Sequence, residues 1–160
     1  MTGWNWRLLA IVPGLVALSC SEPRGPLSPP VVPRPAPPAQ PAAPAVKPGA
    51  VTRMSITTYF PLQQAGRTLT YDVRPGIYHS FGHIPGAVSW PKGSYESQLA
   101  AREAEIRSAI QAKRPVILYC TDAACPDSNA IASHLTARGY SVAILEGGYE
   151  EWKTAGMPTE

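Results

Sequence analysis

The sequence contains few of the residues that would indicate a metal site, a nucleic-acid surface or a membrane-spanning helix. It has 3 cysteines and 3 histidines among 160 residues, and their spacing fits no zinc-site pattern, so we expect neither a metal nor a cofactor. The net charge of +3 comes from scattered basic residues that form no stripe, so we expect no nucleic-acid partner. The N-terminal apolar run, residues 8–18, falls short of the roughly 18–20 residues that a bilayer-spanning helix needs.

Residues 1–20 have the pattern of an export signal. Arg7 supplies a positive charge, the apolar run follows, and small residues precede Cys20. The ending at residues 17–20, Ala-Leu-Ser-Cys, resembles the lipobox of bacterial lipoproteins, although that motif usually has leucine in place of Ala17. We therefore expect Cys20 to be lipidated and to anchor the exported protein on the periplasmic side of a membrane or in the cell envelope. The alternative is an ordinary cleaved signal, with Cys20 as an incidental thiol.

Residues 21–50 have the composition of a disordered linker. Eleven of the 19 prolines of the chain lie in this stretch, interleaved with alanine. Proline fixes φ and lacks a backbone donor, so the stretch favours extended polyproline II and is interpreted as a spacer. Pro-x-x-Pro patterns such as Pro30 to Pro33 leave a docking motif as the alternative. The remainder, residues 51–160, is long enough for one hydrophobic core but not for two.

Strand and helix patterns alternate through residues 51–160. Four strands are predicted, at residues 68–73, 87–90, 116–119 and 141–145. Three helices are predicted, at residues 94–113, 126–138 and 149–154. We expect Ser94 to cap the first of them and Ile110 to lie on its buried face, whereas Pro61 interrupts any long helix at residues 51–66. The alternation predicts an α/β fold with a parallel sheet and helices on both faces.

One apolar run in this pattern ends in a cysteine. Residues 116–119 are typical of a buried parallel strand, and Cys120 follows at its carboxyl end, where α/β sheets carry their chemistry. A helix that begins at Pro126 directs its positive dipole end and nearby loop amides toward this sulfur. Such an environment favours a thiolate or a bound anion, although an isolated cysteine at a strand end is usually a small buried apolar residue.

Four motifs in series resemble the rhodanese-like domain. They are Asp72-Val73-Arg74, GHIPGA at 82–87, ILYC at 117–120, and LEGG at 145–148 followed by Trp152 and residues 156–158. The resemblance covers residues 51–160 and implies a three-layer domain with a parallel sheet of about five strands. It also implies a sulfurtransferase in which Cys120 accepts a sulfane sulfur from thiosulfate or a persulfide. The persulfide so formed then passes its sulfur to a thiol acceptor.

The same resemblance makes the stretch from Cys120 to Cys125 a cradle whose backbone N–H groups hold an anion. The residues between the two cysteines are Thr121, Asp122, Ala123 and Ala124. The family pattern often has a glycine in the middle of this loop and a basic residue late in it, and both are missing here. Asp122 and Asp127 add negative charge that raises the pKa of a nearby thiol. We therefore favour a neutral or monoanionic persulfide donor over thiosulfate.

Three residues before the loop are candidates for supporting roles. Asp72 and Arg74 resemble the family's buried pair that braces the loop, and we expect structural support from them and not catalysis. His83 lies in GHIPGA and is expected to shape a turn, with a catalytic base as the alternative. His79 and His134 are interpreted as surface or core residues without a role in the chemistry.

The hypotheses about function differ in the role that they give to Cys125. It could resolve a persulfide or sulfenate, form an easily reduced disulfide with Cys120 that switches the nucleophile off, or line the loop. The leading hypothesis is an exported sulfurtransferase or persulfide carrier, and the alternative is a catalytically silent binding or redox-sensing module with a Cys120–Cys125 disulfide. A phosphatase or arsenate-reductase relative needs an arginine near the end of the loop, and none lies between Cys120 and Ser128. No protein partner is indicated.

Overall fold

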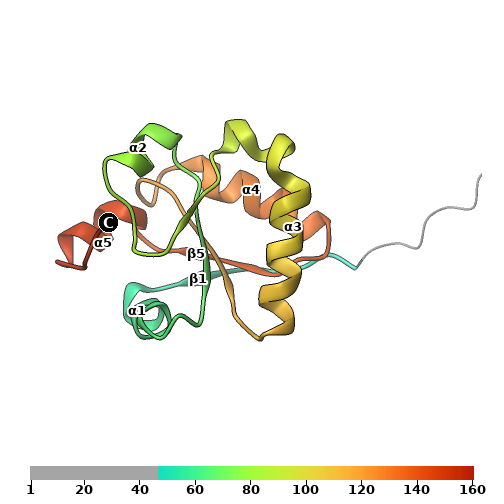
Figure 1. Ribbon diagram of the computed structural model, residues 1–160, viewed down its shortest axis with the longest axis horizontal. Helices are drawn as coiled ribbons and strands as arrows, with labels where there is room; N and C mark the ends of the chain where they lie inside the picture. The colour runs from blue at the N-terminus through green and yellow to red at the C-terminus, as the bar shows by residue number, and fades with distance from the viewer. Residues whose placement is uncertain (1–46) are drawn as a thin grey trace, which may run out of the picture. The chain divides into compact units, whose positions relative to one another are not determined.

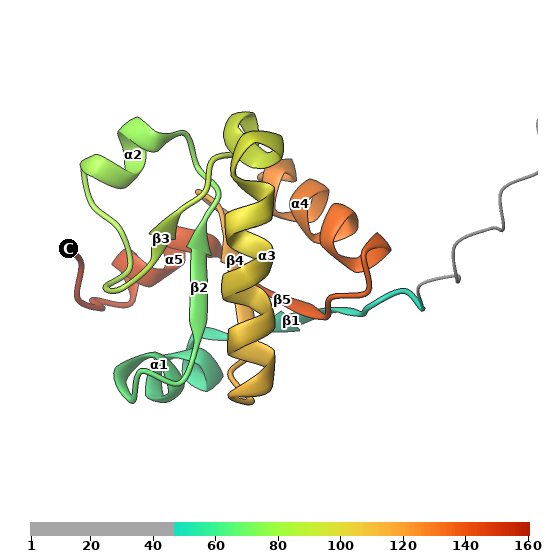
Figure 2. The ribbon, with the colours of Figure 1, turned by 45° about the vertical axis from the view of Figure 1, so that its right-hand side comes forward.

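The computed structural model describes residues 47–160 (Figure 1). It contains one parallel sheet in the order β1-β5-β4-β2-β3 (Figure 2). The strands are β1 (Val51–Met54), β2 (Leu69–Asp72), β3 (Val88–Ser89), β4 (Val116–Tyr119) and β5 (Val142–Leu145). The helices are α1 (Ile56–Gln64), α2 (Gly76–Ser80), α3 (Tyr95–Gln111), α4 (Pro126–Ala137) and α5 (Gly148–Thr154). The predicted signal at residues 1–20, with Cys20, and most of the predicted linker at residues 21–50 lie outside the described residues.

Helices cover both faces of the sheet, as predicted (Figures 1 and 2). The central strand β4 shows why, because its successive side chains point to opposite faces. Val116 and Leu118 belong to a buried cluster with residues of α3 and α4, whereas Ile117 and Tyr119 belong to a second cluster with residues of α1 and α5. Every residue of β4 is buried. The α/β fold with a five-stranded parallel sheet is thereby confirmed.

The stretch that the sequence left unassigned forms β1 and α1. Ser55 caps α1 by accepting a hydrogen bond from the backbone N–H of Thr58 at 3.4 Å. Pro61 lies inside the helix, where its ring costs a hydrogen bond. Burial of Ile56 and Tyr59 against the sheet offsets that cost. The proline therefore did not exclude a short helix held by tertiary packing.

Two details of the predicted helix at residues 94–113 are wrong. Ser94 occupies the N-cap position of α3, but its side chain makes no capping bond because a 3₁₀ turn, Lys92–Ser94, leads directly into the helix. Ile110 is 47% exposed, and Ala109 is the residue buried at that level of the helix. A smaller side chain therefore faces the sheet near the carboxyl end of α3. Within residues 47–160 no helix is long and apolar enough to cross a membrane.

Candidate functional site

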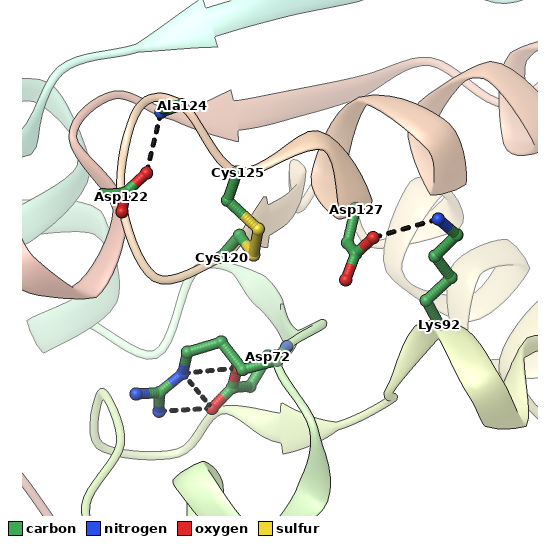
Figure 3. The surroundings of a disulfide bond; sticks show 8 residues. Asp72, Lys92, Cys120, Asp122, Ala124, Cys125 and Asp127 are labelled. Atoms are coloured by element: carbon green, nitrogen blue, oxygen red, sulfur yellow. Dashed lines mark hydrogen bonds and ion pairs between the residues drawn. A yellow bond between two sulfur atoms is a disulfide. The ribbon is translucent and has the colours of Figure 1, made fainter.

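Cys120 and Cys125 form a disulfide at the carboxyl edge of the sheet (Figure 3). Cys120 directly follows β4 and is 3% exposed, whereas Cys125 is the N-cap residue of α4 and is partly exposed. Their Cα atoms are 6.1 Å apart, which is within the usual range for disulfides. Residues 120–125, which we call the Cys120 loop, thus form a closed ring between the central strand and the helix.

The first turn of α5 holds the start of the Cys120 loop. The backbone N–H of Tyr149 donates to the carbonyl of Cys120 at 2.9 Å, and the N–H of Glu150 donates to the carbonyl of Thr121 at 2.9 Å. Gly148 has a φ of +59°, and a Cβ atom built on it would lie 2.5 Å from the Cys120 carbonyl oxygen. Glycine is needed here because the two segments approach so closely. The motif at residues 145–148 thus positions the loop besides forming a turn.

Asp122 turns back on the Cys120 loop and occupies two of its amides. Its Oδ1 accepts a hydrogen bond from the backbone N–H of Ala124 at 2.8 Å, and its carbonyl accepts one from the N–H of Cys125 at 3.4 Å. The expected cradle of free N–H groups is therefore incomplete while the disulfide is formed. The Asp122 carboxylate points toward the Ala124 amide, on the far side of the loop from Asp127 (Figure 3).

Asp127 is the acidic residue closest to the two sulfurs. One of its carboxylate oxygens lies within 4.8 Å of both Sγ atoms. The Nζ of Lys92 forms an ion pair with this carboxylate at 3.0 Å, so its negative charge is partly balanced. Lys92 and Asp127 also line a cavity of about 430 Å³ with Pro75, Gly76 and Pro91. The cavity therefore reaches the Lys92–Asp127 pair, and neither cysteine belongs to its lining.

Lys92 supplies the positive charge that the Cys120 loop lacks in its own sequence. The sequence predicted no basic residue within the loop itself, and Arg74 was expected only to brace it. The turn that contains Lys92 follows β3, and the parallel strands bring the ends of β3 and β4 to the same edge of the sheet. Lys92 is 35 residues from Asp127 in the sequence, so no local spacing could indicate their contact.

Cys120, Cys125 and Asp127 also form the one cluster in residues 47–160 whose ligand atoms could surround a metal ion. The two sulfurs are joined in the disulfide, and a disulfide sulfur is not a thiolate ligand. Metal binding by this cluster therefore requires reduction. The expected absence of a metal stays a prediction.

Asp72 and Arg74 form a fully buried ion pair beside the Cys120 loop. The guanidinium donates from Nη2 to Asp72 Oδ2, at 2.6 Å, and from Nε to Oδ1, at 2.9 Å. Nη2 also donates to the carbonyl of Gly82 at 2.8 Å. Burial alone would lower the pKa of Arg74, but the hydrogen bonds and charge of Asp72 outweigh it and raise the pKa above the usual value. Arg74 therefore stays charged and fixes the turn that contains GHIPGA.

His79 joins this pair, contrary to the expectation that it is a surface or core residue without a specific role. Its Nδ1 lies 3.0 Å from Asp72 Oδ2, and its ring stacks on His83 with centroids 3.7 Å apart. We call Asp72, Arg74 and His79 the Asp72 network. His83 shares both backbone hydrogen bonds with Glu160, at 2.8 and 3.0 Å. These backbone bonds hold Glu160 against the turn and do not involve the imidazole of His83, whose role stays a prediction.

Tyr119 connects the Asp72 network with the strand that carries Cys120. Its hydroxyl accepts a hydrogen bond from the backbone N–H of Ile84 at 3.2 Å, and the Arg74 guanidinium lies 5.5 Å from its ring centroid. Burial raises the pKa of Tyr119, and the nearby Asp72 carboxylate raises it further. Arg74 also lies 4.0 Å from the ring centroid of Tyr149, whose N–H holds the loop. The network and the loop are therefore packed against shared aromatic rings.

A family profile for the rhodanese-like domain matches residues 61–155, which include the Asp72 network and the whole Cys120 loop. The chain belongs to the rhodanese-like family. The resemblance predicted from the four motifs is confirmed, and rhodanese-like domains are consistent with sulfur transfer.

Similar proteins place the domain in different contexts. The chain is 36% identical over 101 residues to the HTH-type transcriptional regulator Rv0324 of Mycobacterium tuberculosis. That match covers 61% of this chain but 40% of the regulator, so it concerns the shared domain and not the regulator's whole activity.

Two solved structures share the fold at lower sequence identity. The BH2092 protein of Bacillus halodurans is 22% identical with a TM-score of 0.56, over 68% of this chain and 76% of that protein. A rhodanese-related protein from Thermoplasma volcanium is 17% identical with a TM-score of 0.56, over 68% and 97%.

Proposed function

We propose that this protein is an exported rhodanese-like sulfurtransferase or persulfide carrier in which Cys120 accepts the sulfur. The observation that carries the proposal is the position of Cys120, at the carboxyl end of the central strand and at the start of a short loop that ends in the helix α4. A 12-residue helix places its positive dipole end beside that loop. This field favours the thiolate that the chemistry requires.

The reaction begins with the reduced form of the loop. The Cys120 thiolate attacks the outer sulfur of a persulfide donor, the sulfur–sulfur bond of the donor breaks, and the donor leaves as a thiolate. A thiol acceptor then attacks the outer sulfur of the Cys120 persulfide and restores the Cys120 thiolate. The charged residues at the cavity next to the loop are Lys92 and Asp127, and they form an ion pair with each other. The pair as a whole is neutral, which favours a donor of low charge over thiosulfate.

Mass spectrometry of the reduced full chain tests this proposal. The chain is treated separately with thiosulfate and with a low-molecular-weight persulfide, and the peptides are mapped under non-reducing conditions. We expect one added sulfur atom on Cys120 in the matched variant Cys125→Ser, which has no second thiol in the loop, and none in Cys120→Ser. Sulfur transfer to a thiol acceptor that persists in Cys120→Ser contradicts the proposed role.

A redox-sensing or binding module without catalysis is the second candidate. The disulfide between Cys120 and Cys125 favours it, because this bond removes the nucleophile. The similarity to a transcriptional regulator is consistent with such a regulatory use. The same experiment separates the two candidates. A loop that oxidises and reduces reversibly, but accepts no sulfur from any donor, is a sensor and not a transferase.

We further propose that Cys20 anchors the protein to a membrane through a lipid. Support comes from the short apolar run, the sequence Ala-Leu-Ser-Cys at residues 17–20 and the proline-rich stretch that follows. Detergent partitioning of the full chain, expressed in a bacterium, tests this proposal against Cys20→Ser. The parent is expected in the detergent phase and the variant in the aqueous phase. Equal retention of both in the membrane fraction contradicts lipidation as the anchor.

A further inference from the structure

We propose that Cys125 resolves the persulfide on Cys120, so that the domain releases sulfide and forms the disulfide seen in the structure. This activity rests on the proposed function, because it begins with a persulfide on Cys120. It differs from sulfur transfer in its product. The sulfane sulfur leaves as hydrosulfide and is not handed to an acceptor.

The geometry identifies which sulfur Cys125 reaches. In the structure the Sγ of Cys125 is bonded to the Sγ of Cys120 itself, which is the inner sulfur of a Cys120 persulfide. In the disulfide form, the Asp122 carbonyl and carboxylate accept hydrogen bonds from the N–H groups of Cys125 and Ala124, so the closed loop needs no support from outside its six residues at this end. The other end of the loop is held by the Tyr149 N–H on the Cys120 carbonyl. Attack on the inner sulfur therefore requires no rearrangement of distant elements.

The position of Cys125 also favours its reactive form. It is the N-cap residue of α4, so the helix dipole stabilises a thiolate there. The nearest carboxylate, on Asp127, is paired with Lys92 at 3.0 Å and so repels that thiolate less. The loop thus places a second activated sulfur within bonding distance of the first.

The step balances without an additional oxidant. The Cys125 thiolate attacks the Sγ of the Cys120 persulfide, the bond between Sγ and the outer sulfur breaks, and that sulfur leaves with the electron pair and its proton as HS⁻. The two cysteines are oxidised to a disulfide while the sulfane sulfur is reduced to sulfide. Hydrosulfide is a weakly basic leaving group, which favours this direction of cleavage.

A thiol reductant must then regenerate the dithiol. Because Cys120 is 3% exposed and Cys125 is partly exposed, the reductant attacks the Cys125 sulfur first. Cys120 leaves as the thiolate, and Cys125 carries the mixed disulfide. A second thiol group, from the same dithiol or from another molecule, attacks that mixed disulfide and releases Cys125. Cys120, which accepts the next sulfane sulfur, is therefore released as a thiolate before Cys125 is.

A single-turnover measurement tests the proposal. The full chain in a Cys20→Ser background is reduced, loaded with a low-molecular-weight persulfide, freed of excess donor by rapid desalting and left without reductant. Sulfide is trapped with monobromobimane, and the peptides are mapped under non-reducing conditions. We expect about one sulfide per loaded chain, with complete loss of the Cys120 persulfide and appearance of the Cys120–Cys125 disulfide.

Two variants give the controls. Cys125→Ser should keep the persulfide that it acquires on Cys120 and release no sulfide per persulfide loaded. Cys125→Ser/Ser133→Cys has the same number of thiols as the parent, with the second one moved to an exposed position of α4. It should behave like Cys125→Ser, which shows that position and not thiol content matters.

The outcomes distinguish this proposal from the function on which it rests. A persulfide that stays on Cys120 in the parent, or that moves intact to Cys125, overturns the resolving step and leaves sulfur loading established. Failure of every donor to load Cys120 overturns both. Treatment of the oxidised chain with glutathione, followed by acid quenching, should yield the mixed disulfide on Cys125. A mixed disulfide on Cys120 contradicts the proposed order of reduction.

Discussion

Two neighbouring turns at the carboxyl edge of the sheet are held by different forces. The Cys120 loop, after β4, is closed by a covalent bond and by hydrogen bonds among exposed or partly exposed residues. The turn after β2 is held by the Asp72 network, in which Asp72 is fully buried and Arg74 is 3% exposed. Reduction can open the first turn, but no redox reaction can open the second. The protein thus combines a loop whose closing bond depends on the redox state with a turn whose bonds do not.

This difference determines what a change of redox state does to the domain. The hydrogen bonds of the Asp72 network do not depend on the disulfide, because their partners are backbone and side-chain groups between residues 72 and 82. The carbonyls of Cys120 and Thr121 remain bonded to α5 in the same way through backbone groups. Reduction is therefore expected to free the part of the loop near Cys125 and to leave the position of Cys120 unchanged.

Loss of the buried Asp72 carboxylate should lower the free energy of unfolding more than the other changes considered below. Asp72→Ala leaves Arg74 charged and buried without its partner, and we expect the free energy of unfolding to fall by about 3–5 kcal/mol in urea denaturation. Asp127→Ala is the matched control, because it removes a carboxylate from the ion pair with Lys92, whose side chain is 54% exposed. That change should cost about 1 kcal/mol or less. Equal losses in the two variants would contradict the contrast between the two turns.

A larger side chain at the contact between α5 and the Cys120 loop should cause the second-largest loss in the free energy of unfolding. In Gly148→Ala the new Cβ meets the Cys120 carbonyl oxygen at 2.5 Å and the residue keeps a φ of +59°, so we expect a loss of about 2–4 kcal/mol. Gly66→Ala shares the positive φ, +64°, but has no atom within 4 Å of the Cβ. It should lose about 1 kcal/mol in the same thermal or urea unfolding measurement. Similar losses for both would show that the close approach adds nothing to the backbone strain.

Reduction of the disulfide should have a smaller effect. Opening a loop of this size restores entropy to the unfolded chain and lowers the free energy of unfolding by about 2 kcal/mol. Urea unfolding of the full chain in a Cys20→Ser background, with and without a phosphine reductant, measures this difference. Cys125→Ser in the same background should show no dependence on the reductant. Hydrogen exchange should rise at residues 122–125 on reduction and remain unchanged at residues 72–74, and an equal rise at both would contradict the independence of the two turns.

The smallest effect should come from the residue that links the two turns. Tyr119→Phe removes the acceptor for the buried N–H of Ile84, and we expect a loss of about 1–2 kcal/mol. Because the folded state raises the pKa of Tyr119, its neutral form is favoured by folding. The resulting contribution to stability is intact below the ordinary tyrosine pKa of about 10 and is lost as the pH rises above it.

Urea unfolding at a series of pH values measures that dependence. The parent should lose stability above about pH 10 more steeply than Tyr119→Phe does. Tyr78→Phe is the control, because Tyr78 is 52% exposed, and it should follow the parent at every pH. Parallel curves for the parent and Tyr119→Phe would show that the buried hydroxyl does not control the alkaline transition.

The sequence by itself determined the α/β class, the family and the position of Cys120 at a strand end. These features depend on local patterns, namely apolar runs for buried strands, helical spacing between them, and short motifs at fixed order. Even the helix α4 was predicted to start at Pro126, where the structure begins it, because proline at the first helical position is a strong local signal. The helix α1 was missed, since tertiary burial of Ile56 and Tyr59 outweighs the local effect of Pro61.

Only the tertiary structure determined which charged residues pair at the site and which contacts hold the Cys120 loop in place. The pairing of Lys92 with Asp127, the contact of His79 with Asp72 and the packing of Gly148 against Cys120 join residues that are distant in the sequence or that have no distinctive local pattern. They arise because parallel strands bring separate turns to the same edge of the sheet. Sequence spacing could place a cysteine at a strand end, but which residues surround it was determined only by the folded chain.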